Sequence, residues 1–154
     1  NQESQNIHYL HGALPLFDTG LEVIKEEYTG DAFLLQNISA RLEGGQYPVF
    51  VTAGDGDEKL ARIRHNRYLS FCYDQLCKIE GSLVSFGFNF GDYDLHIIDA
   101  INKAAKHGSN QPERLWSVYI GVYSADDAAR IASIEHCFHC KVNTFDAKTA
   151  GVWE

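Results

Sequence analysis

Short apolar segments alternate with segments of helical periodicity along most of the chain. Residues 94–105 and 125–134 place apolar side chains three and four positions apart, as one face of a helix requires. The predicted strands around them are residues 48–52 (PVFVT), 83–86, 115–122 and 141–145. Several of these strands are continuously apolar, which is typical of a parallel sheet covered by helices on both faces. We therefore expect an α/β fold with three layers (αβα) and a mostly parallel sheet.

The N-terminal part of the chain predicts further elements around glycine-containing turns. Residues 7–10 predict a short strand that ends at His11 and Gly12. Residues 14–17 and 21–28 predict a hairpin with Gly20 in its turn. Three more helices are predicted at residues 31–42 with Asp31 as the cap, at 58–65 and at 68–80, with a loop at 107–113.

Length and charge exclude some classes of protein. The 154 residues fit a single domain, and the formal net charge of -8 offers no basic surface for nucleic acid. No apolar run approaches the roughly 20 residues of a membrane span, and no signal peptide opens the chain. We expect a cytoplasmic protein without nucleic-acid or membrane partners. Because the chain starts at Asn1 and contains no methionine, we also expect it to be part of a longer protein.

The four cysteines form two sequence pairs, Cys72/Cys77 and Cys137/Cys140. The segment HCFHC (residues 136–140) has the spacing of half a zinc site. The other pair cannot supply the second half, because residues five apart on a helix face different sides. We expect free thiols and no metal.

Polar and glycine residues gather where the strand at 83–86 gives way to a helix. In parallel sheets, ligands bind beyond the carboxyl ends of the strands. Gly87 would let a ligand approach, Asn89 offers a donor and an acceptor, and Asp94 and His96 open the helix. The alternative is structural, because an aspartate often caps a helix and a histidine in a first turn is often an ordinary helix residue.

The pair His11-Gly12 is a second candidate. A histidine at a strand end can accept a proton near neutral pH, and Gly12 leaves room beside the ring. Taken alone, a His-Gly pair does not identify a catalytic base.

Three segments carry a family resemblance: YLHGAL, PVFVTAGDGDEKLARIRHNRYLSFCYDQLCKIEGSLVSFGFNFGDYDLHIIDAI and FDAKTAGVW. They resemble the C-terminal part of a bacterial family known as domain of unknown function 4917. That family is in turn similar to the sirtuin-like, Rossmann-like NAD-binding fold. The resemblance implies that His11 is a catalytic base acting on the nicotinamide ribose. It also implies an NAD cofactor contacted by Gly12, by Gly87 and Asn89 after a strand, and by Asp94.

Two functions follow from this resemblance. The first is binding of NAD or a related nucleotide, with cleavage of its glycosidic bond in the longer protein. The alternative is a non-catalytic nucleotide-sensing or protein-interaction domain. Two features favour the alternative: Asn89 replaces the usual hydroxyl residue, and no glycine-rich loop precedes His11. We expect His11 to lie within one ligand length of Asn89, and the chain alone to bind NAD weakly. Because the sheet would lack its N-terminal strand and loop, we also expect the chain to bury an exposed strand or apolar face against a second copy, its own terminus or a missing segment.

Overall fold

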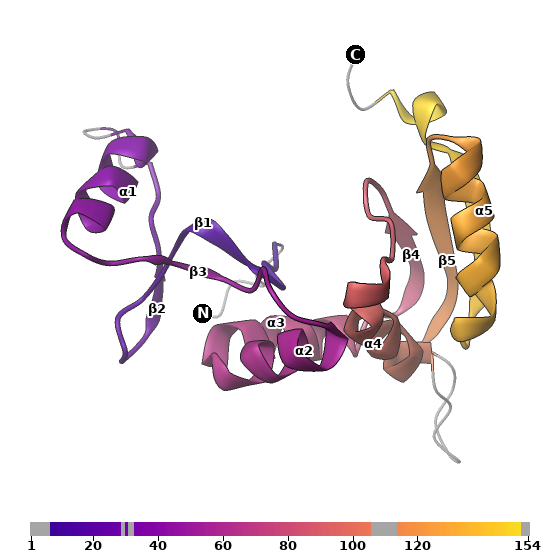
Figure 1. Ribbon diagram of the computed structural model, residues 1–154, viewed down its shortest axis with the longest axis horizontal. Helices are drawn as coiled ribbons and strands as arrows, with labels where there is room; N and C mark the ends of the chain where they lie inside the picture. Colours follow the sequence, from indigo (N-terminus) through magenta and orange to yellow (C-terminus); the bar gives the residue numbers. More distant parts are fainter. Residues whose placement is uncertain (1–6, 29, 31–32, 106–113, 152–154) are drawn as a thin grey trace. The chain divides into compact units, whose positions relative to one another are not determined.

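The structure is a computed structural model that describes residues 7–28, 30, 33–105 and 114–151 (Figure 1). The chain divides into two compact units, Asn1–Tyr73 and Asp74–Glu154. Among the described residues, each unit has a three-stranded sheet of its own. A single domain over the whole chain stays a prediction. The predicted cap Asp31 and the predicted loop at 107–113 lie outside the described residues.

The sheet of the first unit is antiparallel. Its strands are β1 (Gly12–Asp18), β2 (Val23–Lys25) and β3 (Pro48–Phe50), in the order β2-β1-β3. The predicted hairpin is confirmed: the backbone N–H of Thr19 donates to Glu22 O at 3.0 Å across its turn. A connection this short can only join antiparallel strands. The expected parallel arrangement therefore does not extend to this unit.

The predicted strand at residues 7–10 is wrong. Residues 7–9 have no regular secondary structure, and Leu10 and His11 form a turn in which Gly12 N donates to Tyr9 O at 3.1 Å. A turn closed by its own hydrogen bond leaves no length of extended backbone for a ladder. His11 thus precedes a strand instead of ending one.

Strand β1 is central although it contains Pro15, which has no N–H to donate. Its pairing with β3 is irregular between Gly12 and Phe17, which is the stretch that contains the proline. A break in the ladder at this point is the expected accommodation of a proline in a central strand.

Two helices complete the first unit, α1 (Leu34–Glu43) and α2 (Gly56–His65), and α3 (Arg67–Leu76) crosses the boundary between the units. The predicted break between α2 and α3 at Asn66 is confirmed. Asn66 Oδ1 accepts hydrogen bonds from the N–H groups of Tyr68 and Leu69 at 3.1 Å, which satisfies the free amides of α3. Helix α3 ends earlier than predicted.

The second unit contains the parallel sheet that the sequence predicts. Strands β4 (Gly81–Ser85), β5 (Leu115–Val122) and β6 (Lys141–Asp146) lie in the order β4-β5-β6. Helix α4 (Leu95–Ala105) connects the first two strands, and α5 (Ala125–Ile134) connects the last two. The strands and helices of this unit lie within a few residues of their predicted bounds.

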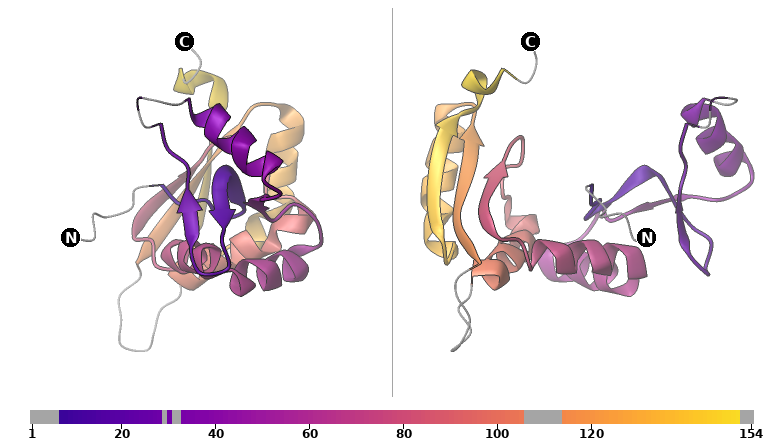
Figure 2. Two further views of the ribbon diagram at one scale, coloured as in Figure 1. Left: turned by 90° about the vertical axis from the view of Figure 1, so that its left-hand side faces the viewer. Right: turned by 180° about the vertical axis from the view of Figure 1, so that it is seen from behind.

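The two connecting helices lie on the same face of this sheet (Figure 2). Consecutive parallel strands joined by right-handed crossovers require this arrangement. Val118 and Ile120 of β5 are 0% and 1% exposed on the helix side, whereas the cross-strand neighbours Val84 and Tyr119 on the opposite side are 64% and 41% exposed. The described residues of this unit therefore form two layers, and a third layer stays a prediction.

A buried asparagine of α4 forms hydrogen bonds with the segment that follows α5. Asn102 of α4 donates from Nδ2 to Cys137 O and accepts from His139 N, both at 2.8 Å.

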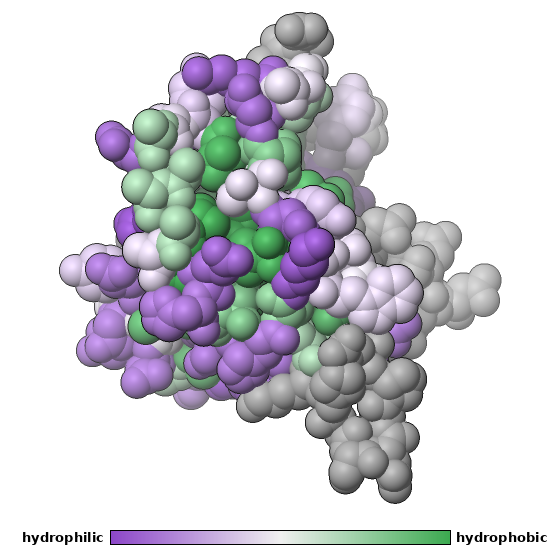
Figure 3. All heavy atoms as spheres, turned by 90° about the vertical axis from the view of Figure 1, so that its right-hand side faces the viewer, coloured by the Kyte–Doolittle hydropathy of each residue, from purple (hydrophilic) through white to green (hydrophobic). Residues whose placement is uncertain are grey.

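Seen from the side on which α5 lies in Figure 1, hydrophobic residues are exposed among hydrophilic ones (Figure 3). No helix in the described ranges has the length and apolar character needed to cross a membrane.

Candidate functional site

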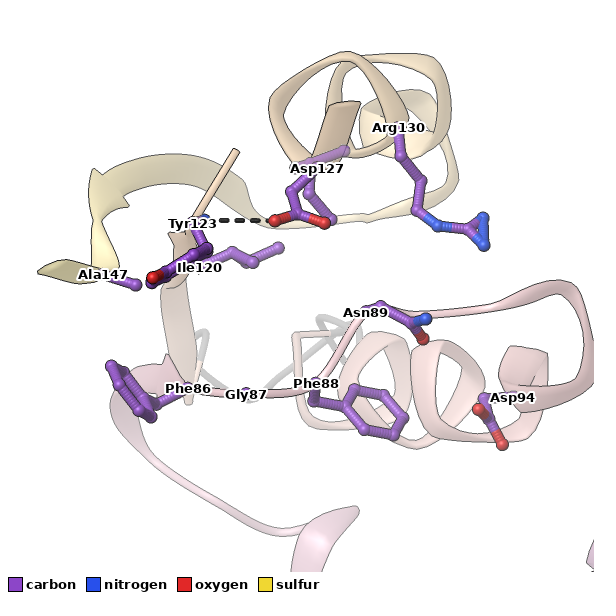
Figure 4. A pocket seen from close by; sticks show the side chains of 12 residues that line it. Phe86, Gly87, Phe88, Asn89, Asp94, Ile120, Tyr123, Asp127, Arg130 and Ala147 are labelled. Carbon is purple, nitrogen blue, oxygen red and sulfur yellow. Dashed lines mark hydrogen bonds between the residues drawn. The ribbon is translucent and has the colours of Figure 1, made fainter. Parts of the chain in front are cut away.

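A pocket of about 580 Å³ lies at the carboxyl end of the parallel sheet (Figure 4). It is bounded by the loop after β4 and by the segments that follow β5 and β6. Its lining residues are Phe86, Gly87, Phe88, Asn89, Asp94, Ile120, Gly121, Tyr123, Asp127, Arg130, Ile131 and Ala147. Ligands of parallel sheets bind at this edge, and the volume is in the range of small-molecule sites.

The loop after β4 has an unusual backbone at two positions. Gly87 has a φ of 70°, and a Cβ at this position would meet no atom within 4 Å. Phe90 has a φ of 48° and is 2% exposed, with its ring between those of Phe88 (4.8 Å between centroids) and Phe138 (5.5 Å). Left-handed backbone is unfavourable for a phenylalanine and persists only where packing enforces it. The buried Phe90 ring therefore fixes the loop that carries Asn89.

Polar groups from two elements meet beside Gly91. The position that a Cβ of residue 91 would occupy lies 3.5 Å from Asn89 Oδ1, 3.9 Å from Asp94 Oδ2 and 4.0 Å from Arg130 Nη2. Figure 4 shows the side chain of Arg130 reaching from α5 towards the loop that carries Asn89, with Asp94 on the same side. The absence of a side chain at Gly91 leaves the space between these groups open.

Gly91 also precedes the short helical turn η1 (Asp92–Asp94), which leads directly into α4. The N-cap position of η1 is Gly91 itself, and no side chain caps it. Asp94 is half-buried in the pocket wall, and its N–H donates to Gly91 O at 2.8 Å.

Asp127 lines the pocket but is engaged by the backbone. Its Oδ2 accepts from the N–H groups of Tyr123 (3.2 Å) and Ser124 (3.1 Å), and its own N–H donates to Ser124 Oγ (3.1 Å). These bonds form a capping box at the start of α5. Hydrogen bonds from the Ser124 side chain and the Tyr123 backbone lower the pKa of Asp127 below its ordinary value.

Arg130 lies one turn after Asp127 and is half-buried. Among the residues that the structure describes, its guanidinium has no ion pair and no side-chain hydrogen bond, and it acts on Asp127 only through its charge. Sequence reasoning missed both residues. The signal for Asp127 was the S-x-x-D pattern after a predicted strand, and the same strand-to-helix step places Arg130 one turn later.

Three of the predicted site residues, Gly87, Asn89 and Asp94, come together in this pocket. His96 is 2% exposed within α4 and is not among the lining residues. No finding tests whether it contacts a ligand, so that role stays a prediction.

His11 and Gly12 belong to the first unit, where Gly12 has a clear structural reason. Its φ is 85°, and a Cβ would lie 1.8 Å from the backbone oxygen of Val49 in the neighbouring strand. The His11 carbonyl accepts from Val51 N at 2.9 Å, which continues the same ladder. Because His11 and Asn89 lie in different units, their shared site stays a prediction.

None of the four cysteines, all of which the structure describes, forms a disulfide. Burial raises the pKa of the Cys72 and Cys140 thiols, which keeps them protonated at neutral pH. In the segment 136–140, all of it described, His136 Nε2 lies 3.5 Å from Cys137 Sγ, and no three ligand atoms come close enough to share an ion.

Comparison with known proteins gives one match. The model of the family described as "Domain of unknown function (DUF4917)" matches residues 1–153. The chain belongs to the DUF4917 family. No curated protein and no solved structure matches it. The family predicted from the sequence is thus confirmed, and the sirtuin-like character of this DUF4917 protein stays a prediction.

Proposed function

We propose that the pocket at the end of the parallel sheet binds a nucleotide, with NAD as the first candidate. One observation carries this proposal: Gly87, Asn89 and Asp94 line one pocket of about 580 Å³ at the carboxyl ends of parallel strands. The sequence and its family resemblance predict these three residues as ligand contacts. Nucleotides bind to parallel α/β sheets at this edge.

Each part of the lining suits a part of a nucleotide. The carboxylate of Asp94 can accept hydrogen bonds from ribose hydroxyl groups, and the amide of Asn89 can both donate and accept. A Cβ at Gly87 would meet no atom within 4 Å, so a ligand can approach the backbone there. Phe86 (37% exposed) and Tyr123 (68% exposed) offer ring surfaces on which a base can pack.

Cleavage of the glycosidic bond needs a general base, and the histidine that the sirtuin-like hypothesis requires is not among the lining residues. The lining, all of it described, includes no histidine and no cysteine. In the sirtuin-like hypothesis this base is His11. The lining alone therefore supports binding of a nucleotide. It favours the non-catalytic nucleotide sensor as the second candidate function.

An NMR titration of the ¹⁵N-labelled chain with NAD, ADP-ribose and ATP tests binding even at millimolar affinity. We expect shifts at the amides of Gly87 and Gly91, and about a tenfold loss of affinity in Asp94→Asn, because a hydrogen bond to a charged group is lost. Asp126→Asn, on α5 but outside the lining, is the matched control. Absence of saturable shifts with all three ligands would refute the proposal.

Catalysis is tested separately by following nicotinamide release from NAD. The hydrolase hypothesis predicts release by the wild-type protein and its loss in His11→Ala. Binding without release in the wild-type protein would support the sensor.

A further inference from the structure

We infer that Arg130 is the phosphate-binding residue of this pocket, so that the pocket selects phosphorylated nucleotides over nucleosides. The inference rests on the proposed nucleotide-binding function and adds a residue on a different element from the loop after β4. It depends on the geometry beside Gly91 and on the charges around the guanidinium.

Polar groups from the loop after β4, from η1 and from α5 converge beside Gly91. Asn89 Oδ1, Asp94 Oδ2 and Arg130 Nη2 lie 3.5, 3.9 and 4.0 Å from the point where a side chain of residue 91 would begin. Two of these groups come from the loop and turn after β4, and the third comes from α5. Acceptor oxygens and a cationic donor therefore face one small space that no side chain fills.

The lining of the pocket contains one cationic and two acidic residues. Arg130 is the only cationic residue in the lining, which lies wholly within the described residues, and its acidic neighbours there are Asp94 and Asp127. The carboxylate of Asp127 is held by the N–H groups at the start of α5. In the described part of the chain the guanidinium makes no ion pair, so its planar set of donors remains available to an anion.

The neighbouring groups indicate which anion Arg130 would bind. A phosphate ester on a ribose lies a few bonds from the sugar hydroxyl groups. One ligand can therefore present hydroxyl donors to Asp94 and phosphate oxygens to Arg130. A simple carboxylate ligand would serve the guanidinium but would give Asp94 no donor. The arrangement of acceptor and cation thus fits a ribose phosphate.

Gly91 offers a way to close this space without disturbing the backbone. Its φ of -63° and ψ of 164° are available to alanine. The added methyl group would meet the three polar groups at ordinary contact distances of 3.5–4.0 Å. Gly91→Ala should therefore fold normally and reduce the room for a phosphate.

The experiment compares AMP with adenosine in NMR titrations of the full 154-residue chain. We expect AMP to bind the wild type at least about tenfold more tightly than adenosine, since charge-assisted hydrogen bonds to phosphate are strong. Arg130→Gln should abolish this preference by weakening AMP binding. Arg130→Lys should keep part of it, because lysine supplies the charge without the planar donors. Gly91→Ala should weaken AMP binding with little change in the spectrum of the free protein.

Arg114→Gln is the matched control. Arg114 lies at the opposite end of β5, next to Leu115, in an exposed ion pair with Glu80 (3.8 Å), and should leave both affinities unchanged. Equal binding of AMP and adenosine, or an unchanged preference in Arg130→Gln, would overturn the inference while leaving nucleotide binding intact. If neither ligand nor NAD binds the wild type, the proposed function and the inference both fail.

Discussion

Gly12 in the first unit and Gly91 in the second show two uses of a residue without a side chain. A Cβ on Gly12 would lie 1.8 Å from Val49 O, inside an antiparallel ladder. A Cβ on Gly91 would touch nothing closer than 3.5 Å, and its neighbours would be polar groups at a pocket. The first glycine is needed for two strands to approach, and the second leaves space open beside polar groups that line the pocket.

The two sheets explain this difference. In the antiparallel sheet, successive strands point in opposite directions, so the residues after each strand are divided between two edges. In the parallel sheet, the segments that follow β4, β5 and β6 all begin at the same edge, and each contributes to the lining of the pocket. Convergence of polar residues is thus a consequence of strand direction in the second unit.

The largest effect should come from Gly12→Ala. A methyl group cannot fit 1.8 Å from a backbone oxygen, so β1 and β3 must separate, and the positive φ adds strain. We expect a loss of at least about 4 kcal/mol in the free energy of unfolding. Hydrogen exchange of the Val51 amide, which donates to His11 O, reports this change directly.

Gly91→Ala is the control for this comparison. Its stability should change by no more than about 0.5 kcal/mol, because the substitution meets neither a clash nor a forbidden backbone. Similar losses for the two variants would show that Gly91 is structural and that the contrast between the two glycines is wrong.

Phe90→Ala should have the next largest effect. The ring is buried between Phe88 and Phe138, and its removal leaves a cavity under a loop with left-handed backbone. We expect a cost of about 3 kcal/mol and weaker nucleotide binding, because the loop would lose its anchor. Tryptophan fluorescence during urea unfolding reports it, since Trp116 lies in β5 of the second unit.

Tyr93→Ala, in the adjacent turn η1, provides the comparison. Tyr93 is 66% exposed, so its removal should change the stability by less than about 0.5 kcal/mol. A Phe90→Ala variant as stable as Tyr93→Ala would mean that the loop is held by other contacts.

The sequence predicted most elements of both units, but it missed the antiparallel sheet of the first. The bounds of β5 and α5 agree with the prediction, because continuous apolar runs and helical periodicity are local signals there. Pairing partners are not local. Nothing in residues 48–52 indicates that this strand would pair with β1 in an antiparallel sheet. Residues 7–10 were predicted as a strand for their apolar side chains, yet the turn before Gly12 takes their place.

For the site, the sequence found the residues that follow β4 and missed those on α5. Gly87, Asn89 and Asp94 stand out because their residue types change abruptly after an apolar strand. Arg130 lies in the middle of an amphipathic helix, where an arginine is usually an exposed residue. Only the three-dimensional convergence beside Gly91 distinguishes it from the other basic residues.

The smallest effect concerns Asp127, which supports the pocket edge from the start of α5. Hydrogen bonds from Ser124 and Tyr123 lower its folded-state pKa below the ordinary value of 3.8, so the unfolded chain takes up this proton first as the pH falls. Its contribution to stability is complete above the ordinary pKa and is lost as the pH falls through the folded-state pKa. Asp127→Asn keeps the amide acceptor but removes the charge. Urea unfolding should therefore show the wild type more stable than the variant at about pH 6, with the difference shrinking below about pH 4. A difference that stays constant over this range would show that the capping hydrogen bonds act without the charge.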